Sequence, residues 1–211
     1  MRRITDMMSD KFDSRALYQI GYGLYVLTTR DEGRDNGCIV NTVMQVTSSP
    51  VIIAVAVNKQ NYTCDIIRKT GLLNINSLTQ DTPFEVFRRV GFQSGRDADK
   101  FAGLTPERSD NGLIVLLNHS IGFLSLRVQS ETDLGTHIMF LCAPEDGKLF
   151  SNAETVSYSY YQKNIKPKIP RQEKKEGFVC RICGHVYDGG TLPEDYICPV
   201  CKHGASDFEP L

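Results

Sequence analysis

The sequence predicts a mainly β protein, in which a β-barrel with short helices is followed by a small metal-binding module. Three observations support this fold class. Residues 1–161 contain seven runs of β-branched, aliphatic or alternating residues, the same region has only two short helical stretches, and residues 178–211 hold two Cys-x-x-Cys pairs. Seven strands with so few helices favour a closed barrel over an open parallel sheet.

The predicted strands are separated by Gly, Asn, Asp and Pro, the residues that usually end strands. They cover residues 18–29, 38–47, 51–57, 72–78, 112–118, 120–130 and 137–143. Two helices fit between them. The first is expected to begin at Thr63 as its N-cap and to end at Gly71. The second is expected to begin near Thr82, with Pro83 at its first position, and to end before Gly91.

Composition and charge exclude several classes of protein. The hydrophobic content of 41% is ordinary for a globular protein, and the net charge of -1 gives no field that attracts nucleic acid or an anionic membrane. The longest apolar run, Val51 to Val57, is too short to span a bilayer, and the charged start lacks the apolar segment of a secretory signal. Cys38, Cys64 and Cys142 are scattered, as free thiols of a reducing compartment would be. We therefore predict a cytoplasmic protein with no nucleic-acid or membrane partner.

A change of composition divides the chain into three parts. Residues 162–177 contain six Lys or Arg, two Glu and two Pro, but only Ile165 and Ile169 as large aliphatic residues. Such a stretch cannot bury enough apolar surface to offset the cost of ordering it. The sequence therefore predicts a barrel domain over residues 1–161, a basic linker over 162–177 and a metal module over 178–211.

The strongest motif lies in that last part, where CRIC at 180–183 and CPVC at 198–201 are separated by 14 residues. Four thiolates in this arrangement can bind one zinc or iron ion tetrahedrally. The alternative is a pair of disulfides, although nothing else in the chain indicates an oxidising compartment. The surroundings favour iron, because Gly184 permits a tight turn whose N–H groups point at sulfur. Aromatic residues available for a small core are Phe178, Tyr187, Tyr196 and Phe208.

Residues 178–211 resemble a rubredoxin, and the short segment between the pairs is closest to the rubredoxin-like tail of rubrerythrins. The resemblance implies one iron ion held by Cys180, Cys183, Cys198 and Cys201. A structural zinc site remains the alternative. His185 and His203 are close in sequence, but four thiolates already complete a tetrahedron, so both are expected at the surface.

The barrel region lacks a Ser-His-Asp order, a P-loop and a GxGxxG motif, and we assign no catalytic side chain to it. Its unusual feature is a polar strand, NTVMQVTSSP (41–50), and a polar turn, NKQNYT (58–63), that opens a helix. The strand could bind a planar heterocycle, and Lys59 at a helix N-terminus is typical of a phosphate site. An ordinary edge strand beside a capped helix would give the same pattern.

The run from Asn36 to Leu78, with SGRDADKF at 94–101 and LGTHIMFLCA at 134–143, resembles the flavin reductase-like family. Its members are FMN-binding split barrels and usually homodimers. The resemblance implies that Asn41 and Thr42 lie against the isoalloxazine, with Gln45 and Thr47 nearby. It implies a ribityl and phosphate site formed by Asn58, Lys59, Asn61, Tyr62 and Thr63.

Two further segments are candidates for the flavin and nicotinamide site. Residues 94–96 could close over the flavin, and His137 of a Gly-x-His element either approaches the nicotinamide or has a structural role.

The two modules together resemble the high-molecular-weight rubredoxin arrangement. That resemblance implies electron transfer from NAD(P)H through FMN to an iron centre held by four cysteines, then to a partner such as a flavodiiron protein that reduces oxygen or nitric oxide. Two other functions stay open: a flavin reductase with a zinc-stabilised docking tail, and a passive carrier reduced by an external reductase. The sequence leaves open NADH or NADPH preference, and whether the tail serves the flavin of its own chain or of a dimer mate.

Overall fold

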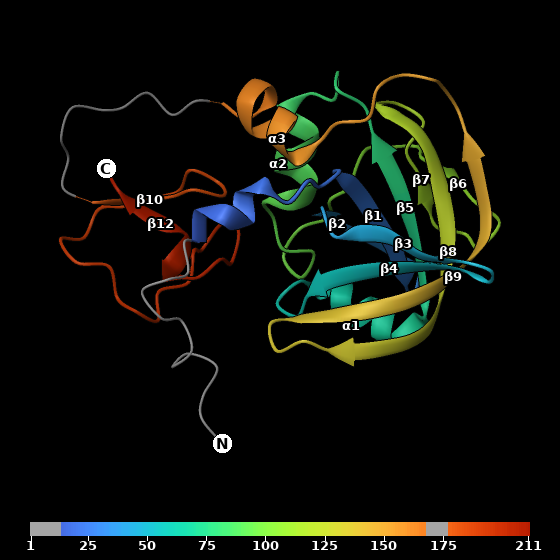
Figure 1. Ribbon diagram of the computed structural model, residues 1–211, viewed down its shortest axis with the longest axis horizontal. Helices are drawn as coiled ribbons and strands as arrows, with labels where there is room; N and C mark the ends of the chain where they lie inside the picture. The colour runs from blue at the N-terminus through green and yellow to red at the C-terminus, as the bar shows by residue number, and fades with distance from the viewer. Residues whose placement is uncertain (1–13, 168–176) are drawn as a thin grey trace.

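The computed structural model describes residues 14–167 and 177–211, which form a large β-barrel and a small C-terminal module (Figure 1). The barrel is one antiparallel sheet of seven strands in the order β2-β1-β5-β8-β9-β4-β3. These strands are β1 (Tyr25–Asp31), β2 (Arg34–Val40), β3 (Val43–Ser48), β4 (Val51–Asn58), β5 (Leu72–Leu78), β8 (Ser120–Asp133) and β9 (His137–Leu149).

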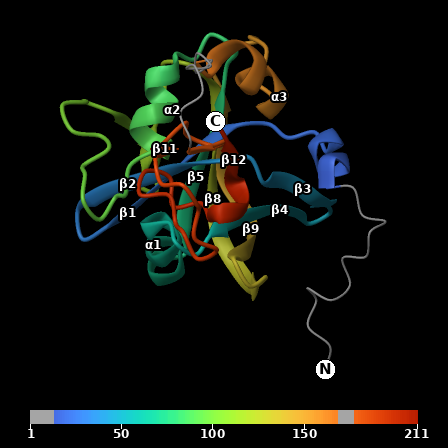
Figure 2. The ribbon, with the colours of Figure 1, turned by 90° about the vertical axis from the view of Figure 1, so that its left-hand side faces the viewer.

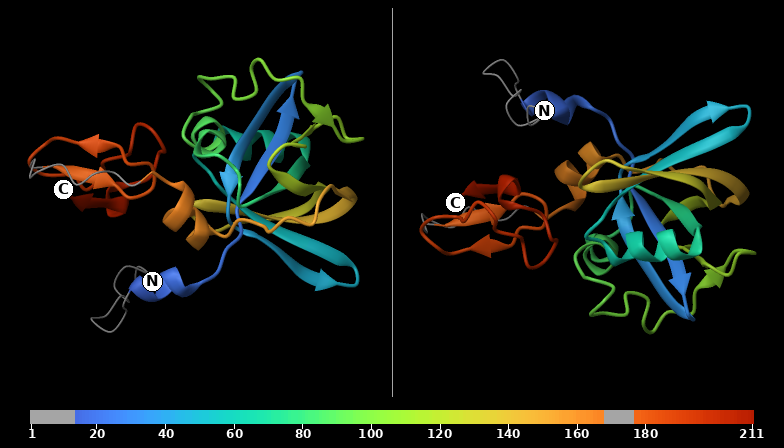
Figure 3. Two further views of the ribbon diagram at one scale, coloured as in Figure 1. Left: turned by 90° about the horizontal axis from the view of Figure 1, so that it is seen from above. Right: turned by 90° about the horizontal axis from the view of Figure 1, so that it is seen from below.

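The barrel is split, because its two edge strands, β2 and β3, follow each other in the chain but do not pair within the described residues. The prediction of one strand over 38–47 was therefore wrong. The chain leaves β2 at Val40 and starts β3 at Val43, and Thr42 is held between them. Its hydroxyl donates to the carbonyl of Ala56 at 2.6 Å, and the N–H of Ala56 donates to the Thr42 carbonyl at 3.1 Å. Figure 3 shows the β3–β4 hairpin extending away from the barrel.

Four other predicted strands differ from the observed ones. Two are longer than predicted, since 120–130 becomes β8 (Ser120–Asp133) and 137–143 becomes β9 (His137–Leu149). Residues 18–29 were expected as one strand, but a 3-10 helix covers Ser14–Gln19 and β1 begins only at Tyr25. The run 112–118 is reduced to β7 (Ile114–Val115), which pairs with β6 (Glu107–Arg108). The backbone beside β7 bonds to side chains instead of a neighbouring strand: Leu116 N–H donates to the Asn76 amide oxygen at 2.9 Å.

The barrel domain has two apolar cores, of which the larger lies in the barrel interior. It is filled by fully buried side chains of six barrel strands and of α1 (Tyr62–Thr70), among them Leu27, Val55, Ile67 and Phe140. The second core lies where α2 (Phe84–Gly91) and the residues after β9 pack on the outside of the sheet, and it contains Val26, Leu78, Phe87 and Tyr161.

Both predicted helices exist, with shifted starts. Asn61, not Thr63, is the N-cap of α1, and Thr63 lies inside the first turn with 1% of its surface exposed. Gly71 caps the C-terminus as predicted, with φ of 69° and its N–H bonded to the Ile67 carbonyl. Pro83, not Thr82, precedes the first residue of α2.

The C-terminal module is a three-stranded sheet of β10 (Phe178–Cys180), β11 (Val186–Tyr187) and β12 (Phe208–Pro210), with a short 3-10 helix at Ala205–Asp207. It lies beside α2 and α3 (Tyr158–Tyr160), as Figures 1 and 2 show. A π-helical turn, Tyr161–Ile165, continues α3, so the first residues of the predicted linker are folded onto the barrel. Residues 168–176 lie outside the described residues. Within the described part of the chain, no helix is long and apolar enough to cross a membrane.

Candidate functional site

The four cysteines of the two Cys-x-x-Cys pairs converge on one point of the C-terminal module. Their sulfur atoms all lie within 4.8 Å of one another. Cys180 Sγ is 3.5 Å from Cys201 Sγ, and Cys183 Sγ is 3.5 Å from Cys198 Sγ. Cys180 and Cys198 are buried, whereas Cys183 and Cys201 are half-buried. All four are free thiols, so the sulfurs are arranged for a metal ion and not as disulfides.

The two pairs sit on matching turns, which we call the first knuckle (residues 180–185) and the second knuckle (residues 198–203). In the first, Cys180 N–H bonds to the His185 carbonyl at 2.8 Å, and Gly184 N–H bonds to the Cys180 carbonyl at 2.8 Å. In the second, Cys198 N–H bonds to the His203 carbonyl at 2.7 Å. Gly184 has φ of 79° and its counterpart Lys202 has φ of 64°, so both turns use the left-handed region.

The thiols influence one another strongly. Hydrogen bonds with Cys183 and Cys201 lower the pKa of the Cys180 thiol. The bond with Cys180 raises the pKa of Cys183 to about 12, and it also raises that of Cys201. A bound metal ion would hold the four sulfurs as thiolates. The donor set fits zinc or iron.

The predicted aromatic core surrounds this centre. Tyr196 packs between Tyr187, at 4.7 Å between ring centroids, and Phe208, at 5.2 Å. His185 Nε2 lies 3.3 Å from the Tyr196 hydroxyl, and His203 Nδ1 lies 3.1 Å from the Cys201 carbonyl. Both histidines are half-buried rather than exposed at the surface, and neither belongs to the group of metal-ligating side chains.

A cleft lies between the barrel and the second knuckle. Its larger cavity, about 420 Å³, is walled by the turn at 59–63, the loop at 93–97 and, from the module, Ile197, Val200, Cys201 and Lys202. A smaller cavity of about 170 Å³ includes Asn41, Tyr161, Ile182, Cys201 and His203 in its walls. Gly91 and Cys201 line both, so the two cavities adjoin at the edge of the metal centre. We call this pair of cavities the interdomain cleft.

The turn at 59–63 presents the N-terminus of α1 to the larger cavity. The N-cap residue Asn61 makes no side-chain hydrogen bond to the helix, although its carbonyl accepts from the Cys64 N–H at 2.8 Å. The N–H groups of Tyr62 and Thr63, before Cys64, are therefore the candidates to bind an anion. Lys59 reaches the cavity while its ammonium contacts the Asp133 carboxylate at 2.8 Å, a contact that lowers the pKa of Asp133. Arg96 bonds the Asp65 carboxylate and lies 4.9 Å from the Tyr62 ring. This end of the cleft fits the phosphate of FMN.

The structure brings together some of the predicted flavin-site residues and not others. Lys59, Asn61, Tyr62 and Thr63 line the larger cavity and Asn41 lines the smaller one, so a flavin could extend from one to the other. Thr42 bonds to β4, and the Asn58 side chain accepts from Gln60 N–H at 2.9 Å to shape the turn. Gln45 and Thr47 lie exposed on β3, outside the walls of both cavities. Their predicted place beside the flavin stays a prediction.

His137 begins β9 opposite Asn58. Its Nδ1 lies 2.9 Å from the Thr136 hydroxyl, and burial together with the nearby His203 lowers its pKa. The histidine of the Gly-x-His element therefore lies on the side of the barrel that faces the second knuckle.

Sequence reasoning missed Lys100, Tyr161 and Lys166. Lys100 is 5% exposed, and its ammonium donates to the carbonyls of Gly37 at 2.7 Å and Val90 at 2.8 Å, beneath the larger cavity. Burial lowers its pKa. The motif SGRDADKF contains this lysine, but its partners come from β2 and α2, so no local signal predicts them.

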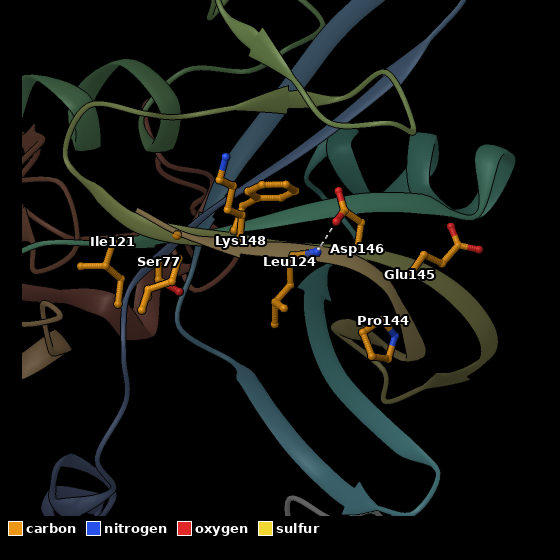
Figure 4. Close-up of a pocket in the computed structure, with 11 residues that line it drawn as sticks. Ser77, Ile121, Leu124, Pro144, Glu145, Asp146 and Lys148 are labelled. Atoms are coloured by element: carbon orange, nitrogen blue, oxygen red, sulfur yellow. Dashed lines mark hydrogen bonds between the residues drawn. The ribbon is translucent and has the colours of Figure 1, made fainter. Parts of the chain in front are cut away.

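A different cavity of about 560 Å³ lies over β5, β8 and β9. None of the cysteines and none of the predicted flavin-site residues lines it. Figure 4 shows Leu124 and Pro144 pointing to one side of the sheet, with Lys148 and Asp146 on the other. The hydrogen bond drawn in Figure 4 joins two neighbouring residues, since the Gly147 N–H donates to the Asp146 carboxylate at 2.7 Å. Leu124 is 39% and Leu149 65% exposed, so part of this surface is apolar contact area.

Comparison with known families finds a match for the barrel region and another for the metal module. Residues 17–168 match the family described as flavin reductase like domain, and residues 178–209 match the rubrerythrin, rubredoxin-like domain. The predicted likeness of the tail to rubrerythrins is thereby confirmed.

Three known proteins illustrate the similarity. The chain is 34% identical to the high molecular weight rubredoxin of Moorella thermoacetica, over 94% of this chain and 100% of the relative. It is 36% identical to the ferric-chelate reductase (NAD(P)H) of Archaeoglobus fulgidus, over 75% of this chain and 94% of the relative. The solved structure of the NADH:FAD oxidoreductase of Streptomyces globisporus superimposes with a TM-score of 0.61 at 16% identity, covering 69% of this chain and 86% of that one.

Proposed function

The chain belongs to the flavin reductase-like domain family and carries a rubredoxin-like domain after it, and on that premise we propose that it is an electron-transfer oxidoreductase. It passes electrons from NAD(P)H through FMN to an iron centre held by the four module cysteines. As in the reductases it resembles, the enzymatic activity resides in the barrel. The observation that carries the proposal is Cys201, a metal ligand that lines both cavities of the interdomain cleft.

Different residues of the cleft have different roles. Bound FMN supplies two-electron acceptance and one-electron release, and the thiolate-bound iron takes single electrons. Lys59 and the N–H groups at the start of α1 hold the phosphate, and Asn41 positions the opposite end of the cofactor. Ile197 and Val200 form the apolar part of the cleft wall next to Cys201. In this arrangement the tail serves the flavin of its own chain.

Partner assignments extend the proposal. We propose a homodimer that uses the exposed apolar side chains of the β3–β4 hairpin and of β8 and β9, namely Met44, Val46, Val51, Leu124 and Leu149. The acceptor of the electrons is a redox protein such as a flavodiiron protein. The cytoplasm is its proposed location, since the seven cysteines, all within the described residues, are free thiols.

An absorption spectrum of the purified protein tests the cofactors. Ferric–thiolate bands over a flavin spectrum are expected, and anaerobic NAD(P)H should bleach both without another enzyme. Flavin with stoichiometric zinc would instead indicate a reductase with a docking tail. Bleaching that requires an added reductase would indicate a passive carrier.

Transfer within the cleft is tested by V200D, which places a carboxylate within the second knuckle, at a residue that lines the larger cavity. We expect the ratio of ferric–thiolate bleaching rate to flavin bleaching rate to fall about tenfold, since small displacements of donor and acceptor have large kinetic effects. V186D is the matched control: Val186 is 42% exposed on β11, against 37% for Val200, and lines neither cavity. Equal ratios in V200D and V186D, measured by stopped-flow absorption, would contradict transfer through this cleft.

A further inference from the structure

Lys166 joins the barrel to the first knuckle of the metal module. It directly follows the π-helical turn Tyr161–Ile165, and its N–H donates to the Tyr161 carbonyl at 2.8 Å. Tyr161 is 5% exposed and packs on Phe87 with 4.5 Å between ring centroids, so this end of the turn is fixed to the barrel. The ammonium of Lys166 donates to the carbonyl of Arg181, which lies between Cys180 and Ile182 in the first knuckle.

The other side of this contact is equally well held. Arg181 N–H donates to the Asp207 carbonyl at 2.8 Å, and its guanidinium donates to the Ser206 carbonyl at 2.8 Å. The Arg181 carbonyl is thereby fixed within the module, one residue from a metal ligand. Lys166 is consequently held at both ends, by the barrel through its backbone and by the module through its side chain.

Lys166 is half-buried, and its ammonium contacts the backbone of the first knuckle. Burial lowers its pKa, while the charges of Cys180, Cys183 and Cys201 act in the opposite direction, as does Glu209. Three of the four metal ligands are thus within electrostatic reach of this one cation. A metal centre with four thiolates adds net negative charge there, which favours the ammonium form.

We propose that Lys166 is a positioning residue whose charge favours the reduced state of the thiolate-bound iron centre while the module is docked on the barrel. This inference rests on the proposed iron site. Four thiolates with ferric iron carry one net negative charge, and uptake of one electron adds a second, so a fixed cation nearby stabilises the reduced form more than the oxidised form.

The same coupling acts on docking. Because linkage is reciprocal, a cation that favours reduction in the docked state also makes the reduced module dock more tightly than the oxidised one. Beside the flavin the centre is then a better electron acceptor. Once the module leaves the barrel, Lys166 no longer stabilises the extra charge, and the centre is a stronger donor to an external partner.

The test measures the iron potential in the full-length protein reconstituted with ferrous iron. Redox mediators set the potential, and ferric–thiolate absorption reports the state. We expect K166Q to shift the equilibrium about three- to tenfold toward the oxidised form, which lowers the midpoint potential by up to about 59 mV. K166R keeps the charge and should stay near the parent protein. K163Q is the matched control, because Lys163 is exposed on the same turn and loses the same charge.

A K166Q potential equal to that of the parent protein would overturn the proposal, as would an equal shift in K163Q. A second readout is hydrogen exchange of the first knuckle, which should slow on reduction in the parent protein and not in K166Q. Because mediators replace NAD(P)H, the outcome is separate from the proposed function. A shift in K166Q without bleaching by NAD(P)H would reject the reductase and keep the role of Lys166.

Discussion

The barrel and the metal module are stabilised by different means. The barrel interior contains fourteen buried apolar residues, and a second core lies outside the sheet. In the module core three residues are buried, Cys180, Cys198 and Phe208, and two of these are metal ligands. A domain this small buries too little apolar surface to fold by the hydrophobic effect alone. The barrel is therefore expected to fold without a metal, whereas the module depends on one.

Metal removal should separate the two regions most clearly. Binding of structural zinc contributes about 10–16 kcal/mol in zinc-finger peptides. By the same coupling of metal binding to folding, chelation under reducing conditions should unfold the module and leave the barrel folded. Hydrogen exchange should rise throughout residues 177–211 and stay unchanged in β5 and β9. If the module stayed protected from hydrogen exchange after complete metal loss, its folding would not depend on the metal.

Thiol labelling at pH 8 provides the control. Burial raises the pKa of Cys142 to about 12, and burial followed by the nearby Asp65 raises that of Cys64 to about 11. A thiol whose pKa is raised stays protonated until the pH approaches that value, so both should resist labelling. After chelation the four module cysteines should react and these two should not. Labelling of Cys64 or Cys142 would show that the barrel had opened too.

A cavity in the barrel core should destabilise the barrel and leave the metal module unchanged. Phe140 is fully buried between α1 and the sheet, and F140A should lower the free energy of unfolding by about 3–5 kcal/mol. Urea denaturation followed by far-UV circular dichroism measures the loss. L149A, at a side chain 65% exposed on the same strand, should change stability by less than about 0.5 kcal/mol. The ferric–thiolate spectrum of F140A should be unaffected at low urea, and an altered spectrum would contradict independent stabilisation.

The smallest expected effect concerns the cleft between the two regions. K59A should weaken FMN binding about five- to tenfold, because a charge-assisted contact with phosphate is lost from a half-exposed site. Fluorescence titration of the flavin-free protein measures the affinity. K148A removes an equal charge from the opposite part of the barrel and should leave FMN affinity unchanged. An equal loss of FMN affinity in K59A and K148A would show that Lys59 does not contact the phosphate.

Local patterns were sufficient for many parts of the structure. The spacing of the cysteine pairs and Gly184 predicts the first knuckle, because each needs only a turn of a few residues. The strands at residues 51–57 and 72–78 were predicted within one residue, since both alternate or run apolar between clear breaks. Starts of helices were less certain, and Thr63 was wrongly preferred to Asn61 because both residue types cap helices well.

The sequence by itself determined that this protein has a mainly β domain, a four-sulfur metal site and a polar turn at a helix N-terminus. Only the tertiary structure decided that Cys201 faces the cleft, that Gln45 and Thr47 lie outside its walls, and that Lys166 reaches Arg181. The physical reason is the range of the interactions. Turns, caps and metal knuckles close within a few residues and leave a local signature, whereas the docking of a module depends on surfaces built from distant segments.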